Sequence, residues 1–463
     1  GDDAFTINET PESGLVINLG AGDDRIGVRT VVGALTINAE SGDDQILIGS
    51  QAGFWDIGAA EGERPAYQPA PSLDTTAFIN AQGSLSGVAQ SITVNAGADS
   101  DRVSLDDTLD NDGAAGQLTA AQISGLGMGA AGLVNYNGEL ATEFLEVNLD
   151  AGSSIFEVAS SAANTTTTIQ GRSGDDTFHV LTTAGEVTIY GDEAQVARGV
   201  VLEDRFGASA QVIVDGSDTF YVGSTSSSVV STSVLDHVVG ELNLYGSTAE
   251  GTSDVVHLHD RGDSADNVGT LASNRVTGLG LGAGVSYEEM ERITLNLGDI
   301  GDDTLYVQST HAATTEIHTG DGLDAGDATN DVVNINRVLG QTTIVGGAGN
   351  DIMRVNFDEF GVQTEESGVQ ASLTLQGSEG DDTFKVGLAG GASATIEIED
   401  EVQGTDRLDV LGTSEADLFL FRANQTTLRG MIATFQIDEN REPIEGGYIE
   451  RVNYGAEIDS LVV

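Results

Sequence analysis

The stretch Ser372–Leu388, SLTLQGSEGDDTFKVGL, decides the fold class of this chain. On each side of its central turn, apolar residues alternate with polar ones, which is the pattern of a half-buried β-strand. The alternating residues are Leu373 and Leu375 before the turn and Phe384 and Val386 after it. Glycine gives the turn its backbone freedom, and Asp381-Asp382 places two carboxylates at its end. The stretch therefore predicts two short strands joined by a glycine–aspartate turn.

The same pattern recurs along the chain, and recurrence matters because a single Gly-Asp-Asp is an ordinary turn. Further copies occupy 15–28, 35–48, 167–180, 293–307 and 343–355. The first three glycine–aspartate turns end at Asp3, Asp24 and Asp44, which are 21 and then 20 residues apart. This spacing fits one coil of a solenoid, with two or three short strands and their turns in each coil.

A longer repeat is built from these smaller coils. Gly125 and Gly278 lie 153 residues apart in Gly-Leu-Gly-x-Gly elements, and Tyr136 and Tyr287 lie 151 residues apart in Val-x-Tyr elements. We divide the chain into solenoid coils at 1–50, a Pro/Gly-containing insertion or lateral loop at 51–90, repeat units at 91–240 and 241–400, and a partial unit at 401–463. The longer unit resembles repeats of very large bacterial secreted and surface proteins.

Helical periodicity is weak, because 61 glycines and many Thr, Ser and Asp residues interrupt nearly every window. Short strands with frequent turns leave two all-β architectures open. One is a parallel β-solenoid of the β-helix or β-roll kind, and the other is a set of tandem β-sandwich domains. The regular turn spacing favours the solenoid, in which coils stack about 4.8 Å apart.

The chain carries 74 acidic and 18 basic residues, for a formal net charge of -56. Such a charge repels nucleic acid and anionic membranes. The sequence also contains no apolar run near the roughly 20 residues of a membrane span. A salt-adapted acidic surface would explain the charge in part, but many of the acids cluster at glycine turns. The chain contains no cysteine, which excludes disulfides and thiolate metal sites.

The glycine–aspartate turns have the chemistry of a Ca²⁺ site. Calcium takes six to eight oxygen ligands, and a tight glycine turn can offer several carbonyl oxygens beside its carboxylates. The candidate ligands are Asp3, Asp23, Asp24, Asp43, Asp44, Asp175, Asp176, Asp302, Asp303, Asn350, Asp351, Asp381 and Asp382. Less regular turns at Asp99/Asp101, Asp218, Asp331 and Asp406 are weaker candidates. In a solenoid, an ion held between two turns would connect adjacent coils.

One turn carries a family resemblance. Gly346–Arg354 matches the Gly-Gly-x-Gly-x-Asp-x-apolar-x nonapeptide of RTX calcium-binding proteins, and Gly377–Lys385 and Gly171–His179 each depart from it at the second glycine. The resemblance implies calcium held by the turn aspartates and glycine carbonyls of a parallel β-roll. The RTX roll uses back-to-back nonapeptides, whereas the turns here are mostly farther apart, which favours wider coils with scattered ion sites.

These features predict a calcium-stabilised structural region of an extracellular or cell-surface bacterial protein, such as an adhesin stalk, a surface-layer component or a filament subunit that associates head to tail. One alternative is a β-helix enzyme acting on polysaccharides, but the six histidines form no convincing cluster, and we interpret His257 and His259 as a surface pair. Another is a module that binds a glycan or a cell-surface ligand through 51–90 or through the glycine-rich loops 125–132 and 278–284. We expect no enzymatic activity.

Overall fold

Every regular element in the described part of the computed structural model is a β-strand. The described residues are 1–53, 83–137, 142–192, 216–225, 232–247, 251–320, 329–364, 368–388, 394–399, 404–413, 418–424, 429–435, 437, 440–444 and 449–463. Most of the expected insertion at 51–90 lies outside them. Within these residues there is no helix with the length and apolar character needed to cross a membrane.

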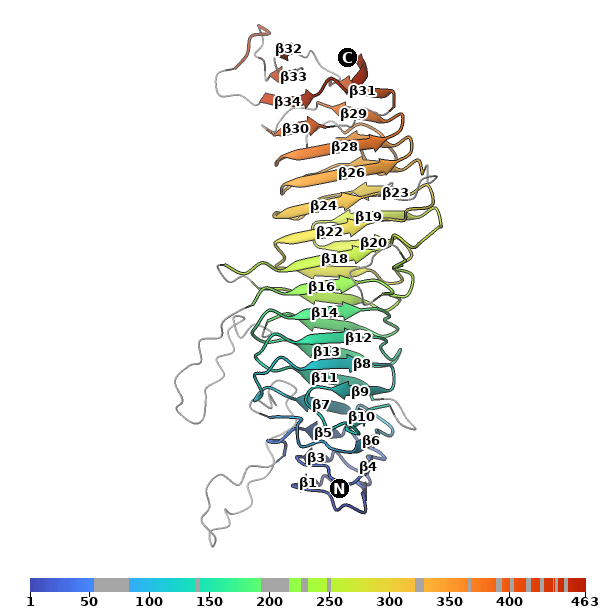
Figure 1. The fold of residues 1–463 in the computed structure, drawn as a ribbon, viewed down its shortest axis with the longest axis vertical. Helices are drawn as coiled ribbons and strands as arrows, with labels where there is room; N and C mark the ends of the chain where they lie inside the picture. Colours follow the sequence, from blue (N-terminus) through green and yellow to red (C-terminus); the bar gives the residue numbers. More distant parts are fainter. Residues whose placement is uncertain are drawn as a thin grey trace. The chain divides into compact units, whose positions relative to one another are not determined.

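The strands belong to two long sheets, with 17 and 18 strands in the described residues, and most neighbouring strands pair in parallel. This arrangement confirms the predicted parallel β-solenoid over the alternative of tandem β-sandwiches. The chain forms two compact units, Gly1–Phe178 with Ala184–Gly216, and His179–Thr183 with Ser217–Val463. Within each unit, successive strands stack as the rungs of a ladder (Figure 1).

The first unit contributes seven strands to each sheet. In the 17-stranded sheet these are β1 (Ala4–Ile7), β3 (Arg25–Val28), β5 (Gln45–Ile48), β7 (Arg102–Asp106), β11 (Phe144–Asn148), β13 (Thr166–Gln170) and β15 (Val187–Tyr190). In the 18-stranded sheet they are β2 (Leu15–Asn18), β4 (Leu35–Asn38), β6 (Ser91–Asn95), β8 (Ala115–Leu118), β9 (Gln122–Gly125), β10 (Leu133–Asn135) and β12 (Ile155–Val158). Strand β14 (Thr177–Val180), in the same sheet, has residues in both units.

The second unit contributes ten strands to each sheet. In the 17-stranded sheet these are β17 (Leu242–Tyr245), β19 (Val268–Ala272), β20 (Arg275–Gly278), β21 (Val285–Glu288), β23 (Thr304–Val307), β25 (Val332–Ile335), β27 (Ile352–Val355), β29 (Thr383–Gly387), β31 (Asp406–Leu411) and β35 (Ile458–Val462). In the 18-stranded sheet they are β16 (Thr219–Val222), β18 (Val255–His259), β22 (Arg292–Asn296), β24 (Thr314–His318), β26 (Thr342–Ala348), β28 (Leu373–Glu379), β30 (Thr395–Ile398), β32 (Phe419–Asn424), β33 (Arg429–Phe435) and β34 (Ile449–Tyr454).

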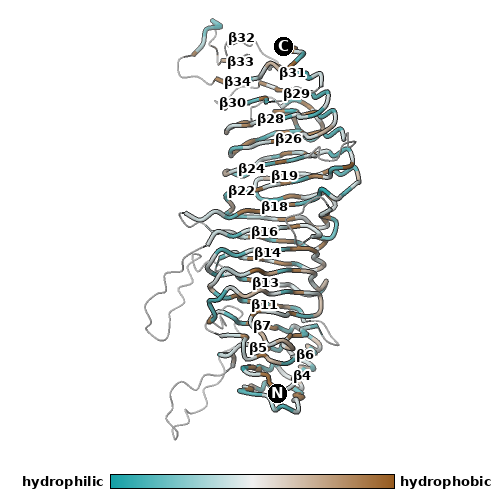
Figure 2. Tube along the Cα trace, viewed as in Figure 1, coloured by the Kyte–Doolittle hydropathy of each residue, from teal (hydrophilic) through white to brown (hydrophobic). Residues whose placement is uncertain are grey.

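The alternating apolar residues form the core, as the sequence pattern predicts. Leu375 on β28 and Phe384 on β29 are both 0% exposed. Parallel pairing sets Leu375 beside Ile344 of the preceding coil and Phe384 beside Met353, so apolar side chains stack on apolar side chains. Figure 2 shows the apolar segments recurring along the strands. Each such buried side chain contributes about 1.5–3 kcal/mol to stability.

The glycine-rich elements of the longer repeat form tight turns of antiparallel hairpins. Strand β9 pairs antiparallel with β8 and β10, and β20 pairs in the same way with β19 and β21. Leu126 and Leu279, which follow β9 and β20, have positive φ values of 52° and 53° between glycines that also have positive φ. Both leucines are 1% exposed, so their burial offsets the strained backbone. These elements therefore have a clear packing role.

The tyrosines of the Val-x-Tyr elements hold the same hairpins. The hydroxyl of Tyr136 donates to the carbonyl of Thr119 at 2.6 Å, and that of Tyr287 donates to the carbonyl of Ala272 at 2.9 Å. We expect Tyr287→Phe to lower the free energy of unfolding by about 1 kcal/mol, because one buried hydrogen bond is lost with little change in volume. Urea unfolding measures the effect, and an unchanged midpoint would argue against a structural role for the hydroxyl.

Candidate cation-binding site

The glycine–aspartate turns lie at the starts of strands. Asp24 directly precedes β3 and Asp44 directly precedes β5. The turn glycines Gly22 and Gly42 have φ values of 129° and 127°, a region that favours glycine. A Cβ atom on Gly42 would lie 2.1 Å from the carbonyl oxygen of Gly22. The turns of consecutive coils therefore approach each other so closely that only glycine fits between them.

The last aspartate of each turn belongs to a hydrogen-bonded row that we call the inner ladder. The backbone N–H of Asp3 donates to Oδ1 of Asp24 at 2.6 Å, and the N–H of Asp24 donates to Oδ1 of Asp44 at 2.7 Å. The N–H of Asp44 donates in turn to Oδ1 of Asp101 at 2.9 Å. Each carboxylate thus accepts a hydrogen bond from the backbone of the preceding coil in the row.

The inner ladder recurs in the second unit. Its donor–acceptor pairs are Asp303 to Asp331 (2.7 Å), Asp331 to Asp351 (2.8 Å), Asp351 to Asp382 (2.7 Å) and Asp382 to Asp406 (2.9 Å). In the first unit, Asp176 takes the same role, since its Oδ1 accepts the N–H of Ser154 at 2.7 Å. The same kind of hydrogen bond therefore connects several coils in each unit, and a glutamate accepts it from Asp101 and from Asp254.

The next-to-last residue of each turn forms a second row, the outer ladder, with the opposite direction. The N–H of Asp43 donates to Oδ1 of Asp23 at 3.0 Å, so here the later coil donates to the earlier one. Asparagine serves equally well, because Asn350 accepts the N–H of Asp381 at 2.8 Å through its amide oxygen. Asp175 donates its N–H to Ser153 Oγ, and Asp302 accepts the N–H of Asn330. The outer ladder needs a hydrogen-bond acceptor and does not need a charge.

Apart from Asp3, which is exposed, the inner-ladder aspartates are buried. Asp44 and Asp101 are 2% and 0% exposed, and Oδ2 of each has no hydrogen-bond partner. Burial is the main cause that raises the pKa of Asp44 to about 6 and that of Asp101 to about 7, and neighbouring carboxylates add to it. The pKa values of Asp303, Asp331 and Asp382 are raised to about 6, 7 and 6, again mainly by burial. A proton or a cation at Oδ2 would stabilise the buried carboxylates of Asp44 and Asp101.

The predicted calcium ligands thus divide into two kinds. The inner ladder contains Asp3, Asp24, Asp44, Asp176, Asp303, Asp351 and Asp382, and the outer ladder contains Asp23, Asp43, Asp175, Asp302, Asn350 and Asp381. Over the described residues, no three of these acids bring ligand atoms within 4.8 Å of one another. Calcium binding at the turns stays a prediction, and the hydrogen bonds between coils are an additional role that spacing did not reveal.

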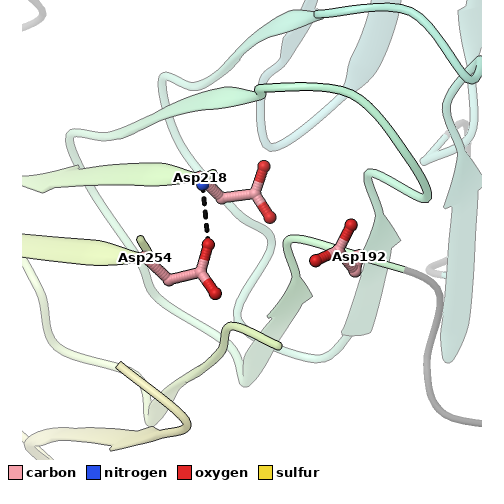
Figure 3. Close-up of side chains that lie close together, drawn as sticks. All are labelled: Asp192, Asp218 and Asp254. Atoms are coloured by element: carbon pink, nitrogen blue, oxygen red, sulfur yellow. Dashed lines mark hydrogen bonds between the residues drawn. The ribbon is translucent and has the colours of Figure 1, made fainter. Parts of the chain in front are cut away.

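Three other buried aspartates do come within that distance. Ligand atoms of Asp192, Asp218 and Asp254 lie within 4.8 Å of one another (Figure 3). Asp192 follows β15, and its Oδ1 accepts the N–H of Gly216 at 2.9 Å. Asp218 precedes β16 and donates its N–H to Oδ1 of Asp254, which precedes β18, at 2.7 Å. This group could hold a metal ion, and its all-oxygen ligands suit a hard cation.

The sequence contains a partial signal for this cluster. Gly216-Ser-Asp218-Thr-Phe repeats Gly174-Asp-Asp-Thr-Phe with one change, which makes Asp218 a weaker candidate ligand. Asp254 precedes an alternating apolar strand, as the other inner-ladder aspartates do, but no glycine stands two residues before it. Asp192 comes after a strand instead of before one, so the turn pattern does not single it out.

The histidines are arranged differently from the expected surface pair. In the second unit, the ring of Tyr221 stacks between those of His179 and His257, with centroids 5.2 and 5.0 Å away. His259 is 7% exposed, and its Nδ1 lies 3.0 Å from Nδ2 of Asn296. Burial lowers the pKa of His259 to about 4, so the ring is neutral at pH 7. The interpretation as a surface pair is therefore wrong for His259.

Comparison of the chain with protein-family models finds no match, and comparison with curated proteins finds none either. The resemblance to RTX proteins accordingly depends on the motifs in the sequence alone.

Proposed function

We propose that this chain is a structural repeat region of a secreted or cell-surface protein, in which cations bound at the glycine–aspartate turns hold consecutive coils together. The observation that carries this proposal is the inner ladder. It places a buried carboxylate of one coil against the backbone of the preceding coil, at the same position in successive coils. Hydrogen bonds repeated in this way hold stacked coils together.

The electrostatics of the row favour a bound cation. An ionised carboxylate buried without compensation is costly, and an adjacent like charge adds to the cost. Oδ1 of Asp44 and Asp101 is engaged by a backbone N–H, whereas Oδ2 has no hydrogen-bond partner. A hard cation at Oδ2 would supply the missing charge, and the carbonyl oxygens of the glycine turns would complete its ligands.

Calcium is the cation that the proposal names. Its coordination is flexible and accepts mixed carboxylate, carbonyl and water ligands, whereas Mg²⁺ demands a compact octahedron and keeps its waters. Extracellular calcium modules have dissociation constants of about 10⁻⁴–10⁻³ M, which would leave the chain unloaded inside a cell and loaded outside it. Such a region would serve as an adhesin stalk, a surface-layer component or a filament subunit.

Far-UV circular dichroism of the full chain tests the proposal. In EGTA at constant ionic strength we expect a weakened β-sheet spectrum or a lowered melting temperature. Millimolar Ca²⁺ should restore the β-sheet signal and the melting temperature cooperatively. Mg²⁺ at the same concentration is the control for general charge screening and should have a smaller effect. A spectrum and melting temperature that are the same in EGTA and in Ca²⁺ would overturn the proposal.

A further inference from the structure

Two aspartates outside the ladders are buried directly after strands. Asp107 follows β7 and Asp260 follows β18, and each is 0% exposed. They lie 153 residues apart, which is the period of the longer repeat, and each begins an Asp-x-x-Asp sequence that ends at Asp110 or Asp263. Neither belongs to a glycine–aspartate turn. The longer repeat therefore carries a second kind of buried acid.

The same hydrogen bonds hold the two side chains. Oδ1 of Asp107 accepts the backbone N–H of Leu85 at 2.8 Å, and Oδ1 of Asp260 accepts that of Leu235 at 2.8 Å. In both turns, the N–H of the second acid donates to the carbonyl oxygen of the first. A separate segment of the chain thus holds each carboxylate, while the backbone carbonyl of the same residue closes its turn.

The other carboxylate oxygen of each residue is buried without a hydrogen-bond partner. This is Oδ2 of Asp107 in the first unit and Oδ2 of Asp260 in the second. The carboxylates that act on them are those of Asp106, Asp110 and Asp150 at Asp107, and those of Asp236, Asp263 and Asp303 at Asp260. Burial is the main cause that raises the pKa of each residue to about 8, and these neighbours add to it. A positive partner at Oδ2 would relieve both effects.

A further buried oxygen lies beside the second turn. Ser233 is 1% exposed and its Oγ has no hydrogen-bond partner. Its carbonyl oxygen accepts the N–H of Gly262, which belongs to the turn between Asp260 and Asp263, at 2.8 Å. Carboxylate, hydroxyl and carbonyl oxygens are the donor set of a hard cation.

The residue in the position of Asp107 and Asp260 differs among the three copies of the longer repeat. The inner-ladder aspartates that begin the equivalent strands are Asp101, Asp254 and Asp406, and the residues six positions later are Asp107, Asp260 and Gly412. Strands β7 and β18 each precede an antiparallel hairpin insertion, β8–β10 or β19–β21, through this turn. Strand β31 also precedes an antiparallel insertion, β32–β34, but it does so through Gly412, so the acid marks this turn in the two complete repeats and not in the third copy.

We propose that Asp107 and Asp260 are the central ligands of two equivalent Ca²⁺ sites that fix the hairpin-bearing coils of the two complete repeats. In the described residues, three carboxylate ligand atoms gather within 4.8 Å only at Asp192, Asp218 and Asp254. An ion at Asp107 or Asp260 would therefore combine one buried carboxylate with carbonyl, hydroxyl and water oxygens. This inference shares its ion with the proposed function but uses different residues, so either can fail without the other.

Equilibrium dialysis of Ca²⁺ against the full chain tests the two sites directly. We expect Asp107→Asn and Asp260→Asn each to bind one ion fewer than the wild type, and the double variant to bind two fewer. Asparagine keeps an oxygen that can accept the Leu85 or Leu235 N–H and removes only the charge. Asp112→Asn is the matched control, because Asp112 is exposed and carries the same charge. Unchanged ion counts in a double variant with the wild-type circular dichroism spectrum would overturn the proposal.

Hydrogen exchange of the wild type gives a second readout that does not depend on a variant folding. Ca²⁺ should slow exchange of the Leu85 and Leu235 amides by about tenfold or more, because the ion would hold their acceptor carboxylates in place. Exchange that slows in the inner ladder at Asp24 and Asp44 but not at Leu85 and Leu235 would overturn the two sites and leave the proposed function intact. Exchange that slows at Leu85 and Leu235 but not at Asp24 and Asp44 would support the two sites and contradict binding at the turns.

Discussion

Replacing Gly42 with alanine is expected to lower the free energy of unfolding by about 3 kcal/mol or more. Its φ of 127° already strains any residue that has a Cβ atom. In addition, that Cβ would lie 2.1 Å from the carbonyl oxygen of Gly22, which is far inside van der Waals contact. Relief requires the two coils to separate, and this would stretch the hydrogen bond from Asp24 N–H to Oδ1 of Asp44. Urea unfolding of the full chain measures the loss.

Gly20 supplies a matched control for this experiment. It has a φ of 102°, but a Cβ atom there would meet nothing within 4 Å. Gly20→Ala should therefore cost only the backbone strain, about 1–2 kcal/mol. The difference between the two variants isolates the close approach of adjacent turns. Equal losses for Gly20→Ala and Gly42→Ala would show that the turns do not pack as tightly as described.

The second large effect is an inverted dependence of stability on pH. Without divalent cations, we expect the free energy of unfolding to fall as the pH rises from about 4 to about 7. The pKa of Asp101 is about 7 in the folded chain, against an ordinary value of 3.8, so the folded chain binds this proton more tightly than the unfolded chain. The resulting stabilisation is fully present below the ordinary pKa and is lost as the pH rises through the folded value. Asp44 and Asp331 shift in the same direction.

Asp101→Asn separates the ladder from the general charge of the chain. Asparagine can still accept the Asp44 N–H, but it has no charge to desolvate. Relative to the wild type, the variant should therefore gain more stability at pH 8 than at pH 4. Asp99→Asn removes one charge from an exposed position two residues away and should leave the slope as in the wild type. Unfolding midpoints in EGTA at constant ionic strength measure both slopes. If the unfolding midpoint of Asp101→Asn depends on pH as steeply as that of the wild type, burial of the ionised Asp101 carboxylate does not destabilise the chain.

Strand pattern and turn chemistry were readable from the sequence because both are local. Leu375 and Phe384 alternate with polar neighbours, and each is buried as that alternation predicts. The turn at Asp381-Asp382 is formed by adjacent residues, so its glycines and carboxylates could be assigned without knowledge of the fold. The solenoid itself followed from the spacing of such turns.

The partners of each turn were not readable, because they depend on which coils are adjacent. Asp44 meets Asp101 across 57 residues of chain, an interval far from the regular spacing of about 20. Neither Asp107 nor Asp260 follows a turn glycine, and their burial depends on the distant segments of Leu85 and Leu235, whose N–H groups donate to them. The burial of His259 also depends on its neighbours in space. Its position on the strand does not by itself distinguish a buried side chain from an exposed one.

The melting temperature of the full chain at pH 5 and pH 8, each in EGTA and in millimolar Ca²⁺ at one ionic strength, tests most directly whether the buried carboxylates between coils need a positive partner. If protons and calcium serve the same oxygens, Ca²⁺ will raise the melting temperature strongly at pH 8 and little at pH 5. In EGTA, the chain will melt at a higher temperature at pH 5 than at pH 8. A calcium effect that is equal or absent at both pH values, with no stabilisation by acid, would contradict the account.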